Sequence, residues 1–562
     1  MCRNLHERFI LATYNHPGIH IQEVLSTRSI QGASTSTPAF VGVTETGPYM
    51  QPVLLTSWAA YQSTFGQLAW YAMVSWSVYE FFKEGGAACY VVRASDKASA
   101  QCASTKQPLA VTAVTPGPWG NAISIMISNA SATDPSITPA PTRPVFNVTV
   151  MVAAALVGTP DTPVVSSMPN LLLQQYILQN GLSPQTFGTA SYYVLEQFNG
   201  FTANSMINEA NKPSALAAQI NAKSMFIRVA VNSTASPAPP VRPPNGGPTA
   251  LSNGGNPIYD LTDATKLLDK VQDLSLLSVP DTVTATDSSG KQSLALQGEL
   301  INSGLTFCID KRNLFYVIDP PFGQSVQDIL SFKSGEGQGP KGNPNALTSE
   351  FGALYYPWVY IQNPIAGANV PIPPSGPVLG RYANTDVNAG VFKSPAGVND
   401  GALTSVVLLG QSLTDADQNL LNPQGINALR NITSYGNVIW GARTLALNTE
   451  WTYVSVRRLC IYVEQSLRQS LMWVVFEPND QQLWSSITRD VSAFLTTLWR
   501  QGGLLGPTAA EAFFVTCDAS NNPLNMRMAG QLFIDIGLAA VYPAEFIVLR
   551  LTLKTSTPDS DS

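Results

Sequence analysis

The sequence predicts a multidomain protein of mixed α/β and α+β class with an extended arm at each end. Its 562 residues exceed one ordinary domain and suggest about three or four. Strand-like apolar runs alternate with amphipathic helical segments in residues 29–98 and 251–440, which is typical of α/β domains. Residues 99–250 between them are nearly uncharged, rich in Ser, Thr, Pro and Ala, and carry short β-like runs separated by turns.

The α/β pattern stops near residue 98 and resumes near residue 251. A domain placed in a loop costs little, because loop-closure entropy grows slowly with loop length. We therefore expect one α/β core split by a β-rich surface insertion, which ends in a Pro/Gly-rich linker at 236–257 with no means of building a core. The expected domains are the arm 1–28, the split core 29–98 and 251–440, the insertion 99–250, the C-terminal domain 441–545 and the C-terminal strand and tail 546–562.

Before the insertion, the expected order is strand, helix, strand. Residues 39–45 form the first strand, and residues 70–84 place apolar side chains on one helical face. Gly85 and Gly86 end this helix, and residues 88–93 form the second strand. This order favours parallel pairing of the two strands.

After the insertion, residues 261–274 predict a helix capped by Thr262 or Asp263. Further apolar runs predict the remaining strands of this domain, at 305–310, 314–320 and 353–361.

The C-terminal domain begins with an amphipathic helix at 453–471 that concentrates charge in a weakly charged chain. Its charged side chains are Arg457, Arg458, Glu464 and Arg468. The three arginines are either ordinary solvent-facing charges or braces for contacts between copies. Glu464 and Arg468 are four residues apart, so an ion pair worth a few tenths of a kcal/mol is expected. A second helix at 481–500, capped by Asn479 or Asp480, and a sheet with helices on one side complete the domain. The expected strands of this sheet are 473–477, 512–518, 532–541 and 546–554.

A short apolar strand is expected in each arm, at 18–25 and 546–554. The apolar side chains of these strands are Ile19, Ile21 and Val24 in the N-terminal arm and Leu549, Leu551 and Leu553 in the C-terminal arm. Such a strand can complete its own sheet, or it can pair with the exposed sheet edge of a neighbouring copy. The polar segment 26–38 is expected to act as a hinge.

Composition limits the possible partners and compartments. Only 12% of residues are charged, against about 25% in a typical soluble protein. This favours either an outside covered by other subunits or a neutral extracellular protein. The net charge of −6 gives no basic footprint for nucleic acid, and the longest apolar run, 148–157, is shorter than the ~20 residues that span a bilayer. The N-terminus does not resemble a secretion signal, the cysteines are expected to be reduced core thiols, and we expect a cytoplasmic protein without membrane insertion.

No catalytic, cofactor or metal site is predicted, so the chain is not expected to be an enzyme. The histidines are confined to the N-terminal arm (His6, His16 and His20), and the chain contains no phosphate-binding GxxxxGK[ST] motif. Ser375 in "PPSGPVLG" is better explained by a tight turn than by a nucleophile. Asp415 and Asp417 are better explained by a helix start after Thr414 than by an acid pair, and Arg381 and Asp386 by an ion pair or loop brace.

Several blocks of the sequence resemble the contractile tail sheath family. They are "PPSGPVLGRYANTDVNAGVFKSPAG" (373–397), "LNPQGINALR" (421–430), "VIWGARTL" (438–445), "YVSVRRLCIYVEQSLRQSLMWVVFEPND" (453–480) and "GLAAVYPAEFIVLRL" (537–551), with "HPGIHIQEV" (16–24) near the N-terminus. These blocks keep the order that they have in the family. The stretch 99–250 matches no family pattern, and the single chain departs from the two-chain sheaths of type VI secretion.

The resemblance implies a subtilisin-like α/β sheath domain without protease residues, followed by a C-terminal sheath domain that faces an inner tube. It implies a helical homopolymer joined by exchanged terminal strands, with an inner tube protein, baseplate proteins and terminal cap proteins as partners. Such a particle is a phage tail or a contractile injection system, assembled in the bacterial cytoplasm. The alternatives are a surface adhesin built on the β-rich insertion and, less favoured, a subtilisin-like hydrolase.

Overall fold

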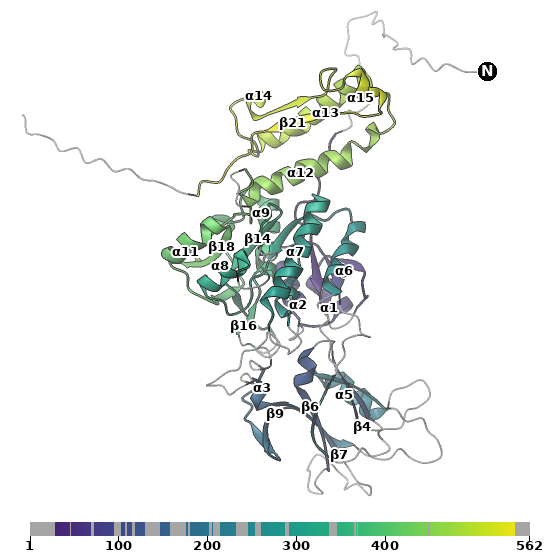
Figure 1. Ribbon diagram of the computed structural model, residues 1–562, viewed down its shortest axis with the longest axis vertical. Helices are drawn as coiled ribbons and strands as arrows, with labels where there is room; N and C mark the ends of the chain where they lie inside the picture. Colours follow the sequence, from purple (N-terminus) through teal and green to yellow (C-terminus); the bar gives the residue numbers. More distant parts are fainter. Residues whose placement is uncertain are drawn as a thin grey trace, which may run out of the picture.

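The computed structural model has mixed α/β architecture, with three bodies arranged along the long axis of the molecule (Figure 1). It describes residues 29–545 except 45–46, 69–71, 95–102, 107–108, 115–117, 130–145, 158–172, 174–175, 178–179, 202–204, 206–213, 232–245, 253–259, 287–291, 337–345, 365–366, 368 and 447–449. Both arm strands of the sequence analysis, with Ile19, Ile21, Val24, Leu549, Leu551 and Leu553, lie outside the described residues.

The central body is built on an eight-stranded sheet in the order β19-β18-β14-β13-β12-β1-β3-β2. The strands from β18 to β3 run parallel, and β19 and β2 form antiparallel edges. The pairing of β1 with β3 confirms the parallel arrangement predicted by the strand–helix–strand pattern. The strands are β1 (Pro38–Gly42), β2 (Pro52–Leu55), β3 (Cys89–Arg93), β12 (Leu276–Ser278), β13 (Phe315–Ile318), β14 (Gly352–Tyr356), β18 (Ile426–Ile432) and β19 (Gly436–Ile439).

Helices pack around this sheet and leave its inner strands β1, β13 and β14 buried along their whole length, as parallel sheets require. A small antiparallel sheet in the order β16-β15-β17 adjoins it. These elements are α1 (Trp58–Phe65), α2 (Val74–Lys83), α6 (Asp260–Lys266), α7 (Leu294–Lys311), α8 (Val326–Ser334), α9 (Ser375–Asn388), α10 (Gly397–Asp400), α11 (Asp415–Leu421), β15 (Val359–Gln362), β16 (Asn369–Ile372) and β17 (Val406–Leu409).

Three predictions of strand or helix bounds in the central body are wrong. Residues 305–310 belong to helix α7, which the Ser293 side chain caps, rather than to a strand. Residues 353–361 form two strands in different sheets, because Pro357 has no N–H to continue a ladder. The helix expected at 261–274 begins at Asp260, so Thr262 and Asp263 lie inside it instead of capping it.

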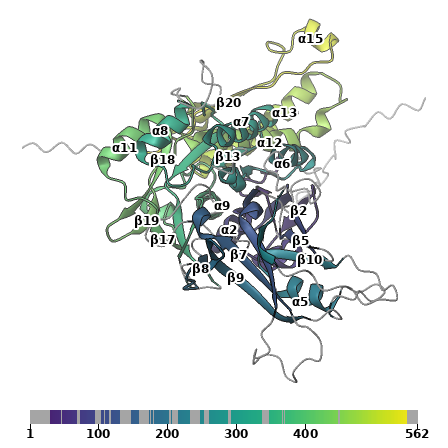
Figure 2. The ribbon, with the colours of Figure 1, turned by 60° about the horizontal axis from the view of Figure 1, so that its bottom comes forward.

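Residues 103–251 form a separate β-rich body, which comes forward in Figure 2. A three-stranded sheet, β10-β5-β4, and a five-stranded sheet, β11-β6-β7-β9-β8, enclose an apolar core to which the central body adds only Val43 and Ala72 among the described residues. Strand β11 and the buried Leu251 fall in the stretch expected to be a linker without a core, so that expectation is wrong there. The elements are β4 (Ala103–Lys106), β5 (Leu109–Ala113), β6 (Ile123–Asn129), β7 (Phe146–Ala153), α3 (Ala154–Val157), β8 (Gln185–Phe187), β9 (Ala190–Phe201), α5 (Ala215–Lys223), β10 (Ile227–Val231) and β11 (Gly246–Ala250).

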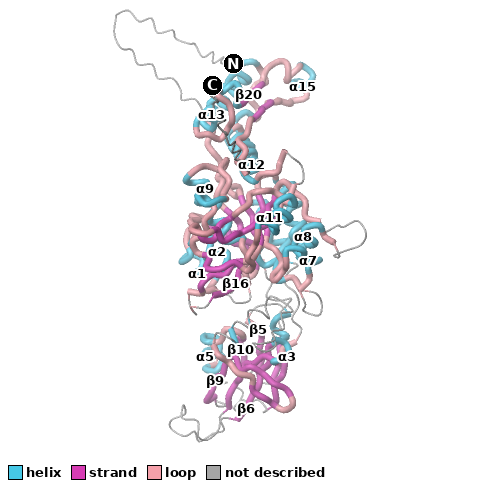
Figure 3. The backbone as a smooth tube through the Cα atoms, turned by 90° about the vertical axis from the view of Figure 1, so that its left-hand side faces the viewer, coloured by secondary structure: helices cyan, strands magenta, loops and turns pink. Residues whose placement is uncertain are grey.

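The C-terminal body lies at the opposite end of the molecule, beyond helix α12 (Figure 3). Both predicted helices are confirmed, and the Asp480 side chain caps the second one. The predicted strand 473–477 is wrong: a 3-10 turn (Met472–Val474) stands there, and exposed Phe476 has a φ of 71°. The described part of the sheet is one hairpin, β20–β21. The elements are α12 (Val454–Ser470), α13 (Gln481–Arg500), α14 (Ala509–Ala512), β20 (Phe513–Thr516), α15 (Leu524–Met528) and β21 (Asp535–Leu538).

Candidate functional site

Helix α12 joins the C-terminal body to the central body, and its arginines are internal. The side chains of Arg457 and Arg458 are only 1% and 3% exposed. A buried guanidinium must be paired with an acid and hydrogen-bonded, because its desolvation is costly. These two residues therefore connect elements of one chain and are not ordinary solvent-facing charges.

Arg457 is paired with acids on both sides of the junction. One terminal nitrogen of Arg457 lies 3.4 Å from the carboxylate of Glu350, which precedes β14. The other lies 3.4 Å from the carboxylate of Glu464, two helical turns further along α12. The guanidinium carbon is 4.3 Å from the ring centroid of Phe351 and 4.5 Å from that of Trp451. The flat cation is thus held between aromatic rings as well as by opposite charge.

Arg458 makes the most buried ion pair of the junction. Its nitrogens bind both carboxylate oxygens of Asp386, at 3.0 and 2.5 Å, and donate to the Thr35 carbonyl at 2.9 Å. Its guanidinium also lies 4.7 Å from the ring centroid of Tyr382. Burial raises the pKa of Asp386, and the ion pair with Arg458 offsets part of that rise. Helices α9 and α12 and the segment before β1 are joined at this one side chain.

Of the two alternatives for Arg381 and Asp386, an ion pair or a loop brace, the ion pair with each other is wrong. Arg381 lies 4.0 Å from the buried carboxylate of Glu84 and within 3.4 Å of the Asp400 carbonyl. On a helix, residues five apart lie on different faces, so Asp386 turns to α12 instead.

The remaining charges predicted on α12 are exposed. The carboxylate of Glu464 forms its ion pair with Arg457 and not with Arg468. The ion pair expected between Glu464 and Arg468 is therefore wrong. Arg468 lies in the last turn, where a cation interacts favourably with the negative end of the helix dipole.

The segment 29–37 lies along α12 and is held by serine side chains. The Gln31 N–H donates to the hydroxyl of Ser470 at 3.0 Å, and the Ala33 N–H donates to that of Ser466 at 2.9 Å. The described part of the segment expected to be a hinge is therefore docked on the helix.

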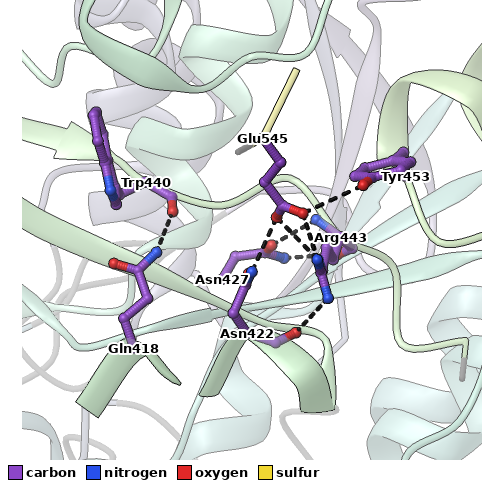
Figure 4. A network of polar contacts seen from close by, with 7 residues as sticks. All are labelled: Gln418, Asn422, Asn427, Trp440, Arg443, Tyr453 and Glu545. Carbon is purple, nitrogen blue, oxygen red and sulfur yellow. Dashed lines mark hydrogen bonds and ion pairs between the residues drawn. The ribbon is translucent and has the colours of Figure 1, made fainter. Parts of the chain in front are cut away.

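The end of the described chain is bound at the opposite end of α12 (Figure 4). Glu545 forms an ion pair with Arg443, whose Nε lies 2.9 Å from Oε1. Asn422 donates to the same oxygen at 3.0 Å, and the hydroxyl of Tyr453, the N-cap residue of α12, donates to Oε2 at 3.3 Å. Tyr542 packs edge-on against Tyr453, with ring centroids 6.0 Å apart. Burial would raise the pKa of Glu545, but the hydrogen bonds from Arg443 and Asn422 outweigh it and the pKa is lowered.

Arg443 is itself fixed to the central sheet. Its N–H donates to the side-chain oxygen of Asn427 at 2.7 Å, and the Asn427 amide donates to the carbonyls of Arg443 at 2.8 Å and of Leu354 at 3.2 Å. Asn427 is in β18 and Leu354 is in β14, so the loop after β19 is attached to two parallel strands. A groove of about 580 Å³ surrounds the Glu545 contacts, and residues of its wall include Ser394, Asp415, Gln418, Arg430, Trp440 and Pro543.

Ser375 does not form the predicted tight turn but begins helix α9. Its N–H and hydroxyl donate to the carboxylate of Asp319 at 2.8 and 2.6 Å, and the Ser278 hydroxyl donates to the Ser375 oxygen at 2.9 Å. Burial raises the pKa of Asp319 to about 7, against the lowering effect of these bonds. Ser375 is fully buried, so no substrate reaches its hydroxyl, and this cluster serves to hold α9 on the sheet.

Asp415 and Asp417 stand at a helix start, as predicted. The Thr414 and Asp417 side chains each accept a hydrogen bond from the other residue's N–H, which forms a capping box. The histidines lie outside the described residues. Within the described ranges, no group of three potential metal ligands occurs. No helix in the described part of the chain combines the length and apolar character needed to cross a membrane.

The buried ion pairs of Arg457, Arg458 and Arg443 thus connect the central body, helix α12 and the end of the described chain. The phage tail sheath protein central domain matches residues 280–445, and the phage tail sheath C-terminal domain matches residues 447–554. The chain belongs to the contractile tail sheath family.

Individual relatives agree with this assignment. The tail sheath protein of Vibrio phage KVP40 is 25% identical over 248 residues, which are 43% of this chain and 36% of that protein. Matches to curated relatives span between 30% and 48% of the relatives' own length.

Solved structures match the fold over almost the whole chain. The sheath complex of an extracellular contractile injection system, PVC, in the contracted state gives a TM-score of 0.54 at 21% identity, covering 96% of this chain and 98% of that one. The contracted helical sheath of the anti-feeding prophage gives 0.52 at 21% identity, covering 95% and 98%.

Sequence reasoning missed the Arg443–Glu545 pair and the partners Glu350 and Asp386. Arg443 lies in the block "VIWGARTL" and Glu545 lies in "YPAEF", and both blocks resemble the sheath family. This resemblance was the signal that could have identified the two residues. Nothing local indicated the pairing, because the two residues are 102 positions apart.

Proposed function

We propose that this chain is a sheath subunit that polymerises helically around an inner tube and contracts from a metastable extended state to drive the tube through a target membrane. The observation that carries this is the succession of both tail sheath domains, 280–445 and 447–554. The particle is a phage tail or a contractile injection system assembled in the bacterial cytoplasm, with inner tube, baseplate and terminal cap proteins as partners. The relatives whose names and titles describe tail sheaths and contracted sheath complexes support it.

The central body is proposed to be a subtilisin-like sheath core interrupted by the β-rich body as a surface insertion. The parallel strands flanked by helices, and the departure of the chain after β3 and its return before α6, support this arrangement. A protease function is not favoured, because Ser375 is buried and bound to Asp319.

Copies are proposed to be joined by exchange of their terminal strands. An open helical polymer needs one patch that fits a different patch on the next copy. The hairpin β20–β21 supplies sheet edges for added strands, and exposed Phe514 and Leu505 lie on or near it.

Contraction would release energy stored in the extended lattice. At about 25 cal/mol per Å², a further ~400 Å² of apolar burial per subunit gives an upper bound near 10 kcal/mol. During this change Arg457 and Arg458 would hold each subunit together internally. Exposed Glu464 and Arg468 are the α12 charges available for contacts between copies.

The test is assembly of the full chain and of strand variants, observed by negative-stain microscopy. The wild type should form tubes. Replacing Leu549, Leu551 and Leu553 with serine should abolish them, because these side chains would fix the donated strand in its partner sheet. The matched control replaces Arg550, Thr552 and Lys554, on the opposite face of that strand, and should still form tubes. A triple-leucine variant that assembles normally would show that the strand is not donated.

A further inference from the structure

The C-terminal segment leaves the described structure from the central body, although it follows the hairpin of the C-terminal body. Beyond β21 the chain pairs briefly with Leu504 and then crosses to Tyr453 and the groove where Glu545 is bound. The described chain therefore ends, at Glu545, beside the central sheet.

The carboxylate of Glu545 accepts hydrogen bonds from three side chains. Arg443, Asn422 and Tyr453 all donate to one carboxylate whose side chain is 20% exposed. Charge-assisted bonds of this kind are stronger than neutral ones and fix geometry when several converge.

The contacts continue without interruption into the sheet. Glu545 binds Arg443, and Arg443 is held through both backbone groups by Asn427 in β18. Asn427 also donates to the carbonyl of Leu354 in β14. The route from the C-terminal segment to two parallel strands bypasses the small hairpin.

We propose that Glu545 and Arg443 form the anchor through which load on the C-terminal arm enters the central body. This inference rests on the proposed function, because only in a polymer does the arm carry load. Without the anchor, tension on residues 546–562 would peel residues 539–545 from the groove and act on the two-stranded hairpin. With it, tension acts on the eight-stranded sheet, where many hydrogen bonds share it.

The first measurement is hydrogen exchange of the dispersed full-length chain. Glu545→Ala should speed exchange of the Leu505 amide, whose N–H donates to the Ala539 carbonyl, by at least about tenfold while amides of β20 and β21 stay unchanged, since loss of the carboxylate opens the segment after β21 locally. Glu545→Gln, which keeps the shape and one acceptor, should give a smaller effect. Arg430→Ala is the matched control: Arg430 lines the same groove but pairs with Asp415 and Gln418.

The second measurement is the urea concentration that dissociates half of the assembled tubes. Glu545→Ala tubes should dissociate at lower urea than wild-type and Arg430→Ala tubes, or should fail to form. Unchanged exchange of the Leu505 amide would overturn the anchor itself. Faster exchange with wild-type urea resistance would overturn its load-bearing role. A wild type that forms no tubes would overturn the proposed function and this role together, while the exchange result still reports whether Glu545 holds the segment.

Discussion

Removing the charge of Asp386 should separate α12 from the central body. Asp386 and Arg458 are 1% and 3% exposed and form two hydrogen bonds, so Asp386→Asn leaves a guanidinium buried without an acid. Unit charges about 3 Å apart at an effective dielectric constant of about 20 attract by roughly 5 kcal/mol, part of which offsets desolvation. Breaking one side of a buried pair typically costs about 3–5 kcal/mol. We expect Asp386→Asn to lower the free energy of unfolding by about 3 kcal/mol.

The assay is urea unfolding of the dispersed chain at pH 7.5, with hydrogen exchange to locate the loss at α12 and α9. Asp263→Asn is the control, because it breaks an ion pair with Lys266 whose side chains are 70% and 65% exposed, respectively. Exposed pairs of this kind contribute about 0–1 kcal/mol. The double variant Asp386→Leu/Arg458→Met should recover about half of the loss, since it removes both desolvated charges. If Asp386→Asn and Asp263→Asn cost the same, the junction does not depend on the buried pair.

Three other substitutions probe single features of the chain. Burial raises the pKa of Glu80 from 4.5 to about 7, so the folded chain keeps a proton that the unfolded chain releases, and stability falls as pH rises across that window. Glu80→Gln should therefore stabilise by about 3 kcal/mol at pH 8 and by almost nothing at pH 4 in urea titrations, and a gain that is independent of pH would refute this assignment. Gly376→Ala would place a Cβ 2.5 Å from the backbone of Ser77 and should lower the free energy of unfolding by about 3 kcal/mol or more. Gly247→Ala is the control and should be nearly neutral, because the space around Gly247 is open. Equal thermal midpoints of the two variants would contradict the close packing of α2 and α9. Phe476→Gly should raise the thermal midpoint by the equivalent of about 1 kcal/mol, because φ of 71° suits glycine, and a lower midpoint would mean that the ring packs within the chain.

The elements that the sequence predicts well have both a repeating pattern and local end signals. Helix α13 has an apolar stripe and an Asp480 cap, and α11 has its Thr414 capping box. Short apolar runs without such signals fail: 305–310 and 473–477 were predicted as strands, and they are a helix and a turn. A run of about five apolar residues fits either structure, and its neighbours decide which one forms.

The partners of charged residues are harder to predict than the elements that carry them. Glu464 is four residues from Arg468, yet it pairs with Arg457, because a buried cation needs acids more than an exposed one does. The other partners, Glu350 for Arg457 and Asp386 for Arg458, come from elements far away in the chain. Sequence spacing describes contacts within one helix, whereas these pairs depend on how bodies pack. The low charge of the whole chain could have indicated the internal pairing of the α12 arginines, because a cluster of charges on one helix is unusual in such a chain.

Helix α12 explains why such a cluster is needed. The segment that leads from the N-terminal arm is bound at its C-terminal end by Ser466 and Ser470, and the start of the C-terminal arm is bound at its N-cap residue Tyr453. Seventeen residues of helix separate these two points by about 25 Å. If both arms connect copies, the spacing of these connections is set by one rigid helix, and the buried arginines fix that helix to the central sheet. A tilt of α12 would move the docked segment 29–37 relative to Glu545, which Arg443 holds on the central sheet. The distance between the two arm origins, and with it the lattice, then depends on the ion pairs of Arg457 and Arg458 even where these residues touch no other copy.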